Sequence, residues 1–419
     1  MFDALTLKPP AVIIAARAVR AFGDGFTALL LPAYLSALGL SPLQIGLVVT
    51  FTLLGSAVFT LGVGLLAHHA RVRSLLAASC ALMLLTGLAF SQARAFWPLA
   101  VVGFLGTLNP SGGDVSLFLP LEHALLAHAG TSQARTRLFA RYSLAGSVMV
   151  ACGALAVRAV DPLGRGLGLG PLSMMQGLFV LYGLLAIPAL ALYARLPSGR
   201  DVQEPPRAPL RQSRRPVLRL AALFSLDSFG GGFVVQPMLV LWLFERFGLS
   251  LATAGAFFFW AGLLTAASML VASPLARRFG LVNTMVFTHI PANVCLVGAA
   301  FAPTLPVALG LLLVRAALSS LDVPARTSYV MAIVSPAERA AAAGVTNVPR
   351  SLAAAISPSL AGSMLAASPF GLPLVLGGAL KIAYDLTLLG LFRAVKPPEE
   401  ATPSSADPSG GRRDRAADA

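Results

Sequence analysis

The stretch AVIIAARAVRAFGDGFTALLLPAYLSAL, residues 11–38, is long and apolar enough to cross a lipid bilayer, yet it contains Arg17, Arg20 and Asp24. An ionised side chain at the centre of a bilayer costs about 2.5–3.5 kcal/mol, so these three groups must face protein or water. At about 100° per residue they fall within a stripe about 60° wide on one side of a helix. We therefore expect a membrane span with one polar face.

The spacing of the three charges leaves their roles open. Arg20 and Asp24 have the i,i+4 spacing of an ion pair, which would either fix the helix in place or take part in transport. Arg17 lies close to the start of the span, and its alternative role is to reach the headgroups at the cytoplasmic rim. Asp24 is the first candidate for a functional carboxylate.

The composition of the whole chain is that of a membrane protein. Of its 419 residues, 57% are hydrophobic and 11% are charged, which excludes an ordinary soluble protein. The formal charge of +14 would suggest a nucleic-acid partner in a soluble chain. Here the basic residues gather in short loops between apolar runs, so the charge indicates orientation in a membrane, with no nucleic-acid partner.

Gly, Pro and charged residues divide the apolar sequence into twelve candidate spans. We place them at 11–38, 42–67, 74–93, 96–121, 138–160, 171–194, 217–245, 250–276, 281–301, 304–333, 340–366 and 370–394. The predicted fold is an all-α membrane protein with twelve transmembrane helices in two pseudo-symmetric six-helix bundles. The bundles would occupy residues 1–197 and 217–395, joined by a Pro- and Arg-rich cytoplasmic linker over 198–216, with a disordered cytoplasmic tail over 396–419.

The loops predict the orientation. Basic residues follow the second, fourth, eighth and tenth spans, whereas the connections near 36–43, 302–305 and 367–371 carry no charge. The positive-inside rule then places both termini in the cytoplasm, and we expect a monomeric, multi-pass protein of the bacterial plasma membrane.

The two halves of the chain also repeat. A shift of about 209 residues brings GLSPLQIG (residues 39–46) onto GLSLATAG (residues 248–255) and places Asp114 close to Asp322. A duplicated six-span unit with its ligand site between the halves is a recurring transporter architecture.

Polar residues inside the spans concentrate on spans 1, 4, 7 and 10. In span 10, Arg315, Ser319, Asp322 and Arg326 are predicted to form one stripe. Lys381 and Asp385, one turn apart in the last span, are interpreted as a pair that satisfies itself, and His289 as a packing residue. The candidates for binding substrate or protons are the carboxylates Asp24, Asp114, Asp227 and Asp322, the arginines Arg20, Arg315 and Arg326, and the amides Asn109 and Gln236.

Small residues and prolines predict two broken spans. Gly230–Phe233 precedes Gln236–Pro237 in span 7, and Asn109–Pro110 precedes two glycines in span 4. Such breaks expose backbone groups, which is tolerated at membrane depth where a cavity or another helix supplies partners.

Enzyme signatures are absent from the sequence. There is no HExxH, GxSxG or GxxxxGK[ST], and the GxGxxA matches lie inside predicted spans. The three cysteines are far apart in apolar runs, so we expect no disulfide, no metal site and no cofactor. The chain is predicted not to be an enzyme.

Twelve spans in two halves, a basic central loop and a Gly-x-Leu-Ala-like loop after span 2 resemble the major facilitator superfamily of secondary transporters. In this loop Gly64, Leu66 and Ala67 match the family pattern, with His68 at its acidic position. The resemblance implies alternating access around a site lined by spans 1, 4, 7 and 10. It also implies gating loops that contain His68, Arg71 and Arg73 in the first half and Arg277 and Arg278 in the second.

The leading hypothesis is a proton-coupled secondary transporter of a small organic solute, with export slightly favoured. Export is favoured by a Ser357–Pro358 step in span 11, which is similar to a motif of drug exporters in the same superfamily. One alternative is an importer or exchanger of an organic anion, favoured by arginines inside the spans. A non-transport alternative is a membrane receptor or a lipid-modifying membrane enzyme, which would need a sensor domain or a clustered His/Asp/Ser site.

Overall fold

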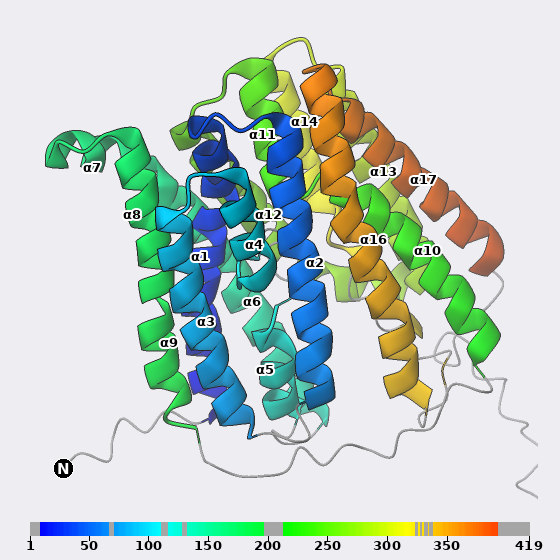
Figure 1. Cartoon of the computed structure of the whole chain (residues 1–419). Coiled ribbons are helices and arrows are strands. Elements are labelled where there is room, and N and C mark those ends of the chain that lie inside the picture. The colour runs from blue at the N-terminus through cyan, green and yellow to red at the C-terminus, as the bar shows by residue number, and fades with distance from the viewer. Residues whose placement is uncertain are drawn as a thin grey trace, which may run out of the picture.

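The chain forms a bundle of helices whose axes are roughly aligned with one another (Figure 1). The structure is a computed structural model, and it describes residues 9–66, 71–109, 116–127, 132–196, 213–322, 326, 329–330, 334 and 338–392. Within these ranges every regular element is a helix. The fold that residues 9–392 adopt is therefore all-α wherever the structure describes it.

Before residue 197 the first three helices lie within a few residues of the expected spans, whereas the expected fourth span is divided between two shorter helices. The bounds of the helices in this part of the chain are α1 Pro9–Ala37, α2 Pro42–Leu66, α3 Val72–Gln92, α4 Phe96–Leu105, α5 Phe118–Ala127, α6 Ser132–Ala156, the short 3-10 helix η2 Val157–Ala159, α7 Val160–Leu167, α8 Pro171–Leu184 and α9 Ala186–Tyr193. α7 lies across the direction of the other helices (Figure 1).

The helices after residue 213 contain both long and broken segments. Their bounds are α10 Arg214–Gly232, α11 Gln236–Phe247, α12 Leu251–Phe279, α13 Leu281–Ala300, α14 Leu305–Leu318, α16 Arg339–Ala367 and α17 Leu372–Phe392. α10 and α11 form one broken segment, because the helix stops at Gly232 and restarts at Gln236. The break expected in span 7 is thus confirmed.

Two spans are shorter than the sequence suggests. α4 ends at Leu105, and the backbone at Gly106 is extended, so the break in span 4 begins before Asn109 rather than at Pro110. α14 ends at Leu318, with Ser319 as its C-cap, where the sequence predicted a helix to residue 333. The predicted stripe from Arg315 to Arg326 is therefore not on one continuous helix.

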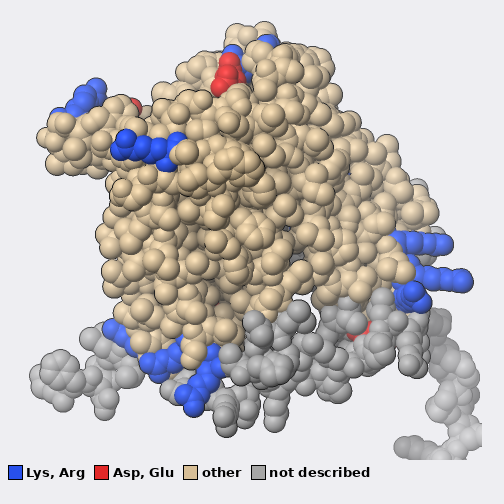
Figure 2. All heavy atoms as spheres, viewed as in Figure 1, with Lys and Arg blue, Asp and Glu red and all other residues tan. Residues whose placement is uncertain are grey.

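Eight helical segments of the described chain are long and apolar enough to cross a membrane, and α4 and α14 are shorter apolar helices. α1 and α16, at 29 residues each, run alongside them. Figure 2 shows an almost uncharged middle band on this face, with basic side chains gathered above and below it. This distribution is the one that a lipid bilayer requires. The full count of twelve spans stays a prediction.

Close helix packing joins distant parts of the chain. Gly25 on α1 lies against the backbone of Val150 on α6, and Gly153 on α6 lies against Phe22 on α1. Gly46 on α2 and Gly362 on α16 lie against each other in the same way. Small residues let the backbones of two helices approach closely, and the van der Waals contacts formed in this way stabilise the association of helices in a membrane. α6 also packs against α12, so helices before residue 197 contact helices after residue 213 at several places.

Candidate functional site

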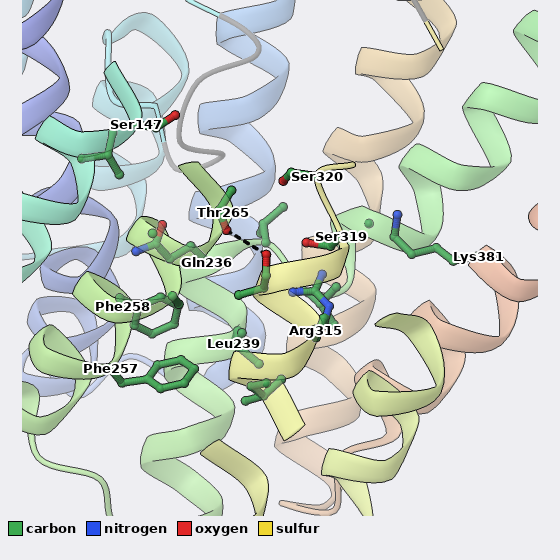
Figure 3. Close-up of a pocket in the computed structure, with 18 residues that line it drawn as sticks. Ser147, Gln236, Leu239, Phe257, Phe258, Thr265, Arg315, Ser319, Ser320 and Lys381 are labelled. Carbon is green, nitrogen blue, oxygen red and sulfur yellow. Dashed lines mark hydrogen bonds between the residues drawn. The ribbon is translucent and has the colours of Figure 1, made fainter. Parts of the chain in front are cut away.

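A cavity of about 410 Å³ lies where α6 meets the helices of the second half (Figure 3). This volume is within the range of about 300–1,000 Å³ that is typical of small-molecule sites. Its lining residues come from α6, from the end of α10, from the α10–α11 break, from α11, α12, α14 and α17, and from the residues just after α14. They are Ser147, Val150, Gly231, Val234, Val235, Gln236, Leu239, Phe257, Phe258, Ala261, Gly262, Thr265, Leu312, Arg315, Ala316, Ser319, Ser320 and Lys381.

Arg315 is the cation of this cavity that has no partner among the described residues. It lies in the last turn of α14, and its guanidinium has no hydrogen bond or ion pair with any residue that the structure describes. Its Nε is buried without a partner. Ser319 and Ser320, just past the end of α14, line the cavity beside it (Figure 3). Arg315 as a whole is half-buried, and an unpaired cation with desolvated donors is costly, so this guanidinium is available to a ligand that brings the missing partner.

Lys381 connects the cavity wall to a buried carboxylate. Its Nζ donates to Asp227 Oδ1 at 2.6 Å, and Arg326 Nη1 donates to Asp227 Oδ2 at 3.1 Å. Arg326 also forms an ion pair with Asp322, four residues away. Asp227 is only 3% exposed, and its two cation partners offset the cost of its desolvation.

His289 extends this buried cluster. Its Nδ1 lies 2.9 Å from Asp385 Oδ1, and its Nε2 lies 3.9 Å from Asp227 Oδ1. Asn293, one turn further along α13, donates to Asp385. The sequence interpretation of Lys381 and Asp385 as a mutual pair is wrong, because Lys381 binds Asp227 while Asp385 binds His289. His289 is buried as expected, but it is part of an ion-pair cluster rather than of the apolar packing.

A second buried cluster lies among the helices before residue 197. Arg20 Nη2 donates to Glu122 Oε2 at 2.6 Å, and the guanidinium stacks 3.8 Å from the ring centroid of Phe118. Tyr142 and Tyr193 each donate to Glu122 at 2.6 Å. Glu122 is fully buried, so three donors from α1, α6 and α9 are held together around one carboxylate on α5.

Asp24 is held more loosely than Glu122. Its carboxylate lies 3.8 Å from Arg17 Nη1, and Arg17 Nε and Nη1 make no hydrogen bond. Arg20, predicted to pair with Asp24, binds Glu122 instead, because the two side chains that converge from α5 and α9 offer shorter contacts. Arg17 is 5% exposed and faces Asp24, so it does not reach toward the headgroups as the alternative proposed.

The structure brings together only part of the predicted site. Arg315 and Gln236 line the cavity, and Asp227, Asp322 and Arg326 form the cluster behind Lys381. The charges of span 1 are not on the cavity wall, contrary to the expected lining by spans 1, 4, 7 and 10. Instead, α6 supplies the wall from the first half of the chain. Asn109 is buried and is not among the residues that line the cavity.

Several predicted residues lie at the margins of the structure or outside it. Asp114 and His68 lie outside the described residues, and so does the side chain of Arg277. Arg71 is the N-cap of α3, and Arg278 stacks on Phe279 with 5.5 Å between its guanidinium carbon and the ring centroid. Arg73, in the first turn of α3, takes part in a contact of its own. The gating role of these loops stays a prediction.

Sequence reasoning missed Glu122, Thr265 and the two phenylalanines of the cavity. Glu122 lies one residue beyond the predicted end of span 4. Because this placed it in a loop, its burial was not predicted. A carboxylate next to an apolar run, FLPLEHALLA, is the signal that could have identified it. Across the described chain, no group of three or more His, Cys, Asp or Glu side chains could hold a metal ion.

The comparisons with known proteins assign the family. The profile of the Major Facilitator Superfamily matches residues 13–358 and 221–415. The chain belongs to the major facilitator superfamily. An uncharacterised membrane protein of Saccharomyces cerevisiae is 27% identical over 413 residues, which cover 90% of this chain and 92% of that protein.

Solved transporter structures share the fold of this superfamily member. The crystal structure of the nucleoside transporter NupG aligns with a TM-score of 0.72 at 15% identity, over 92% of this chain and 100% of that one. A D-xylose-proton symporter aligns with a TM-score of 0.69 at 16% identity, over 90% of this chain and 96% of that one. The family and these neighbours indicate a multi-pass integral membrane transporter of a small molecule, rather than an enzyme.

Proposed function

We propose that this superfamily member is a proton-coupled secondary transporter that moves a small organic solute through the cavity by alternating access, with export as its direction. The observation that carries the proposal is the cavity of about 410 Å³ whose wall residue Lys381 binds the buried Asp227. A solute at this wall changes the electrostatic environment of a carboxylate that belongs to a larger buried cluster. The proton load of such a carboxylate depends on its neighbouring charges, so solute binding and proton binding are linked.

The proposed layout has twelve spans in two six-helix bundles, over residues 1–197 and 217–395. The linker 198–216, the tail 396–419 and both termini would be cytoplasmic, in a bacterial plasma membrane. The basic loops support this orientation through the positive-inside rule. α1 begins and α17 ends at the same end of the bundle, which is consistent with both termini on one side (Figure 1). A neighbour that is a proton symporter supports proton coupling.

Asp24, Asp114, Asp227 and Asp322 are the proposed proton sites. Asp24 is the first among them because Arg17 is its single close cation partner in the described chain, at 3.8 Å. Asp227 already has two cation partners within 3.1 Å. The more weakly paired carboxylate can gain and lose a proton with less disturbance to its surroundings.

The test is efflux of solute from proteoliposomes with an imposed pH gradient. We expect the gradient to drive efflux, and Asp24→Asn to leave exchange without a gradient intact while it removes the response to the gradient. Glu245→Asn serves as the control, because Glu245 is exposed at the end of α11. Transport that ignores the gradient, or that keeps its response after Asp→Asn changes at all four sites, would rule out proton coupling.

A further inference from the structure

The charges on the cavity wall all have one sign. Arg315 and Lys381 are its two charged residues, and none of the lining residues is acidic. Lys381 is largely neutralised by Asp227 at 2.6 Å, whereas Arg315 has no such partner among the residues the structure describes. The net field of the cavity is therefore positive, and it is centred on the guanidinium of Arg315.

The rest of the wall combines polar groups with an apolar surface. Gln236, Ser319 and Ser320 offer hydrogen-bonding groups on the cavity wall, and the hydroxyl of Thr265 donates to the carbonyl oxygen of Ala316 at 3.2 Å. Phe257, Phe258, Leu239 and Leu312 supply an apolar and aromatic surface from α11, α12 and α14 (Figure 3). Such a wall suits a ligand with one anionic group and an apolar or aromatic body.

Inside a low-dielectric cavity an unpaired guanidinium binds carboxylate, sulfonate or phosphate strongly, since it forms two parallel charge-assisted hydrogen bonds. A neutral ligand would leave the guanidinium desolvated and unpaired, and a cationic ligand would be repelled. We propose that the solute of this cavity is a small organic anion whose anionic group binds Arg315 and whose apolar body packs on Phe257 and Phe258. This inference rests on the proposed transport function and specifies its substrate class.

The first test measures the sign of the field in the full-length protein. Cys80, Cys152 and Cys295 are replaced by Ala, and Ser319→Cys places one thiol on the cavity wall, one turn from Arg315. The rate of its reaction with a sulfonated thiosulfonate reagent is divided by the rate with a trimethylammonium thiosulfonate. The same ratio at Ala37→Cys, exposed at the end of α1, normalises for the intrinsic reactivity of the two reagents.

We expect the normalised ratio to favour the anionic reagent and to fall by about tenfold or more when Arg315→Gln is added. Arg315→Lys keeps the charge and should retain most of the preference. Arg246→Gln, at an exposed arginine of α11, should leave the ratio unchanged. A ratio that Arg315→Gln does not alter overturns the assignment of an anion while the proton-coupled transport proposal stands. A thiol that neither reagent reaches from either side of the membrane overturns both.

The second test uses a matched pair of probes of the same shape. 1-Naphthoate and 1-naphthamide differ in charge, and each is added in excess while the Ser319→Cys thiol reacts with an uncharged maleimide. We expect naphthoate to slow the reaction about tenfold more than naphthamide, and this difference to disappear in Arg315→Gln. Equal effects of the two probes, including no effect of either, would contradict the proposed class. Proton coupling is measured separately by the pH-gradient assay, so the two proposals can fail independently.

Discussion

At the scale of single residues, Glu122 is the carboxylate at the centre of the buried cluster among the helices before residue 197. It is fully buried and accepts hydrogen bonds from Arg20, Tyr142 and Tyr193. A buried ion pair contributes little compared with apolar residues of the same shape, but removal of one partner leaves an uncompensated charge. Its role is therefore tested by deletion of the charge rather than of the whole side chain.

Glu122→Gln is expected to destabilise the purified protein by about 3–5 kcal/mol, because Arg20 would remain buried without its counter-ion. Tyr142→Phe, which removes one hydrogen bond to the same carboxylate, should cost about 1.5–3 kcal/mol. Thermal unfolding in detergent measures both. Glu245→Gln, at an exposed position, should change stability by no more than about 0.5 kcal/mol. If Glu122→Gln were as mild as Glu245→Gln, the Arg20 cluster would not be a stabilising unit.

The pair of Lys381 and Asp227 predicts strong non-additivity. Lys381→Met leaves Asp227 with Arg326 as its closest cation, and Asp227→Asn leaves Lys381 as a buried unpaired charge. The double variant Asp227→Asn/Lys381→Met should be more stable than the sum of the single effects predicts, by about 1–3 kcal/mol. A thermal-unfolding cycle measures the difference.

A matched cycle with Asp161→Asn on α7 and Lys381→Met on α17 should be additive. Asp161 is exposed, and α7 lies at the opposite side of the bundle from α17 (Figure 1). Additivity in the first cycle would show that Lys381 and Asp227 do not stabilise each other.

These pairs show where sequence reasoning reaches its limit. Periodicity placed Arg17, Arg20 and Asp24 on one helix face, and burial of all three follows from the cost of charges in lipid. Their partners do not follow, because Glu122 lies 102 positions from Arg20 and Asp227 lies 154 positions from Lys381. The i,i+4 rule selects neighbours along one helix, whereas the bundle offered shorter contacts between helices.

At the scale of helices, local chemistry determined most boundaries. Gly230–Gly232 before Gln236–Pro237 predicted the break between α10 and α11, and most helices end within a few residues of the expected spans, whereas α4 ends at Leu105, well before the expected end of span 4. The sequence failed at α14, whose regular helix ends at Leu318 although no glycine or proline lies between Arg315 and Asp322. Arg326 pairs with Asp322 four residues away, which helical periodicity allows, but it also pairs with Asp227, a non-local contact that periodicity does not contain.

The contact between α2 and α16 makes a prediction about helix approach. A Cβ at Gly46 would clash with the carbonyl oxygen of Pro358, whereas a Cβ at Gly62 on the same helix would meet open space. We expect Gly46→Ala to push the two helices apart and Gly62→Ala to have no such effect. The readout is cross-linking of Thr50→Cys with Ser359→Cys in the cysteine-free background, because the Ser359 backbone N–H donates to Thr50 Oγ1 at 3.0 Å.

The yield of this cross-link should fall severalfold in Gly46→Ala and stay unchanged in Gly62→Ala. Equal yields in both variants would mean that small residues do not set the distance between α2 and α16. A loss in both would indicate a general packing defect rather than a local clash.

At the scale of the whole molecule, the proposed direction of transport depends on which end of the bundle faces the cytoplasm. Ala37 ends α1 at one end, and Ser74 lies in the first turn of α3 at the other end, next to Arg71 and Arg73 (Figure 1). Both side chains are exposed. Because basic loops are retained in the cytoplasm, the end with Arg71 and Arg73 should be the cytoplasmic one.

In the cysteine-free background, an impermeant maleimide should therefore label Ala37→Cys in intact cells and Ser74→Cys only in inverted membrane vesicles. Permeabilised cells, in which both thiols react, control for their accessibility. The reverse pattern would place the basic loops outside and invert the proposed orientation, so that solute efflux along the proposed route would become uptake. Labelling of both thiols from the same side would mean that α2, which lies between them in the sequence, does not cross the membrane. That result would contradict the arrangement of twelve spans. Reaction of each thiol from its expected side would show which end of the bundle is cytoplasmic, and efflux or uptake in the pH-gradient assay is defined relative to that end.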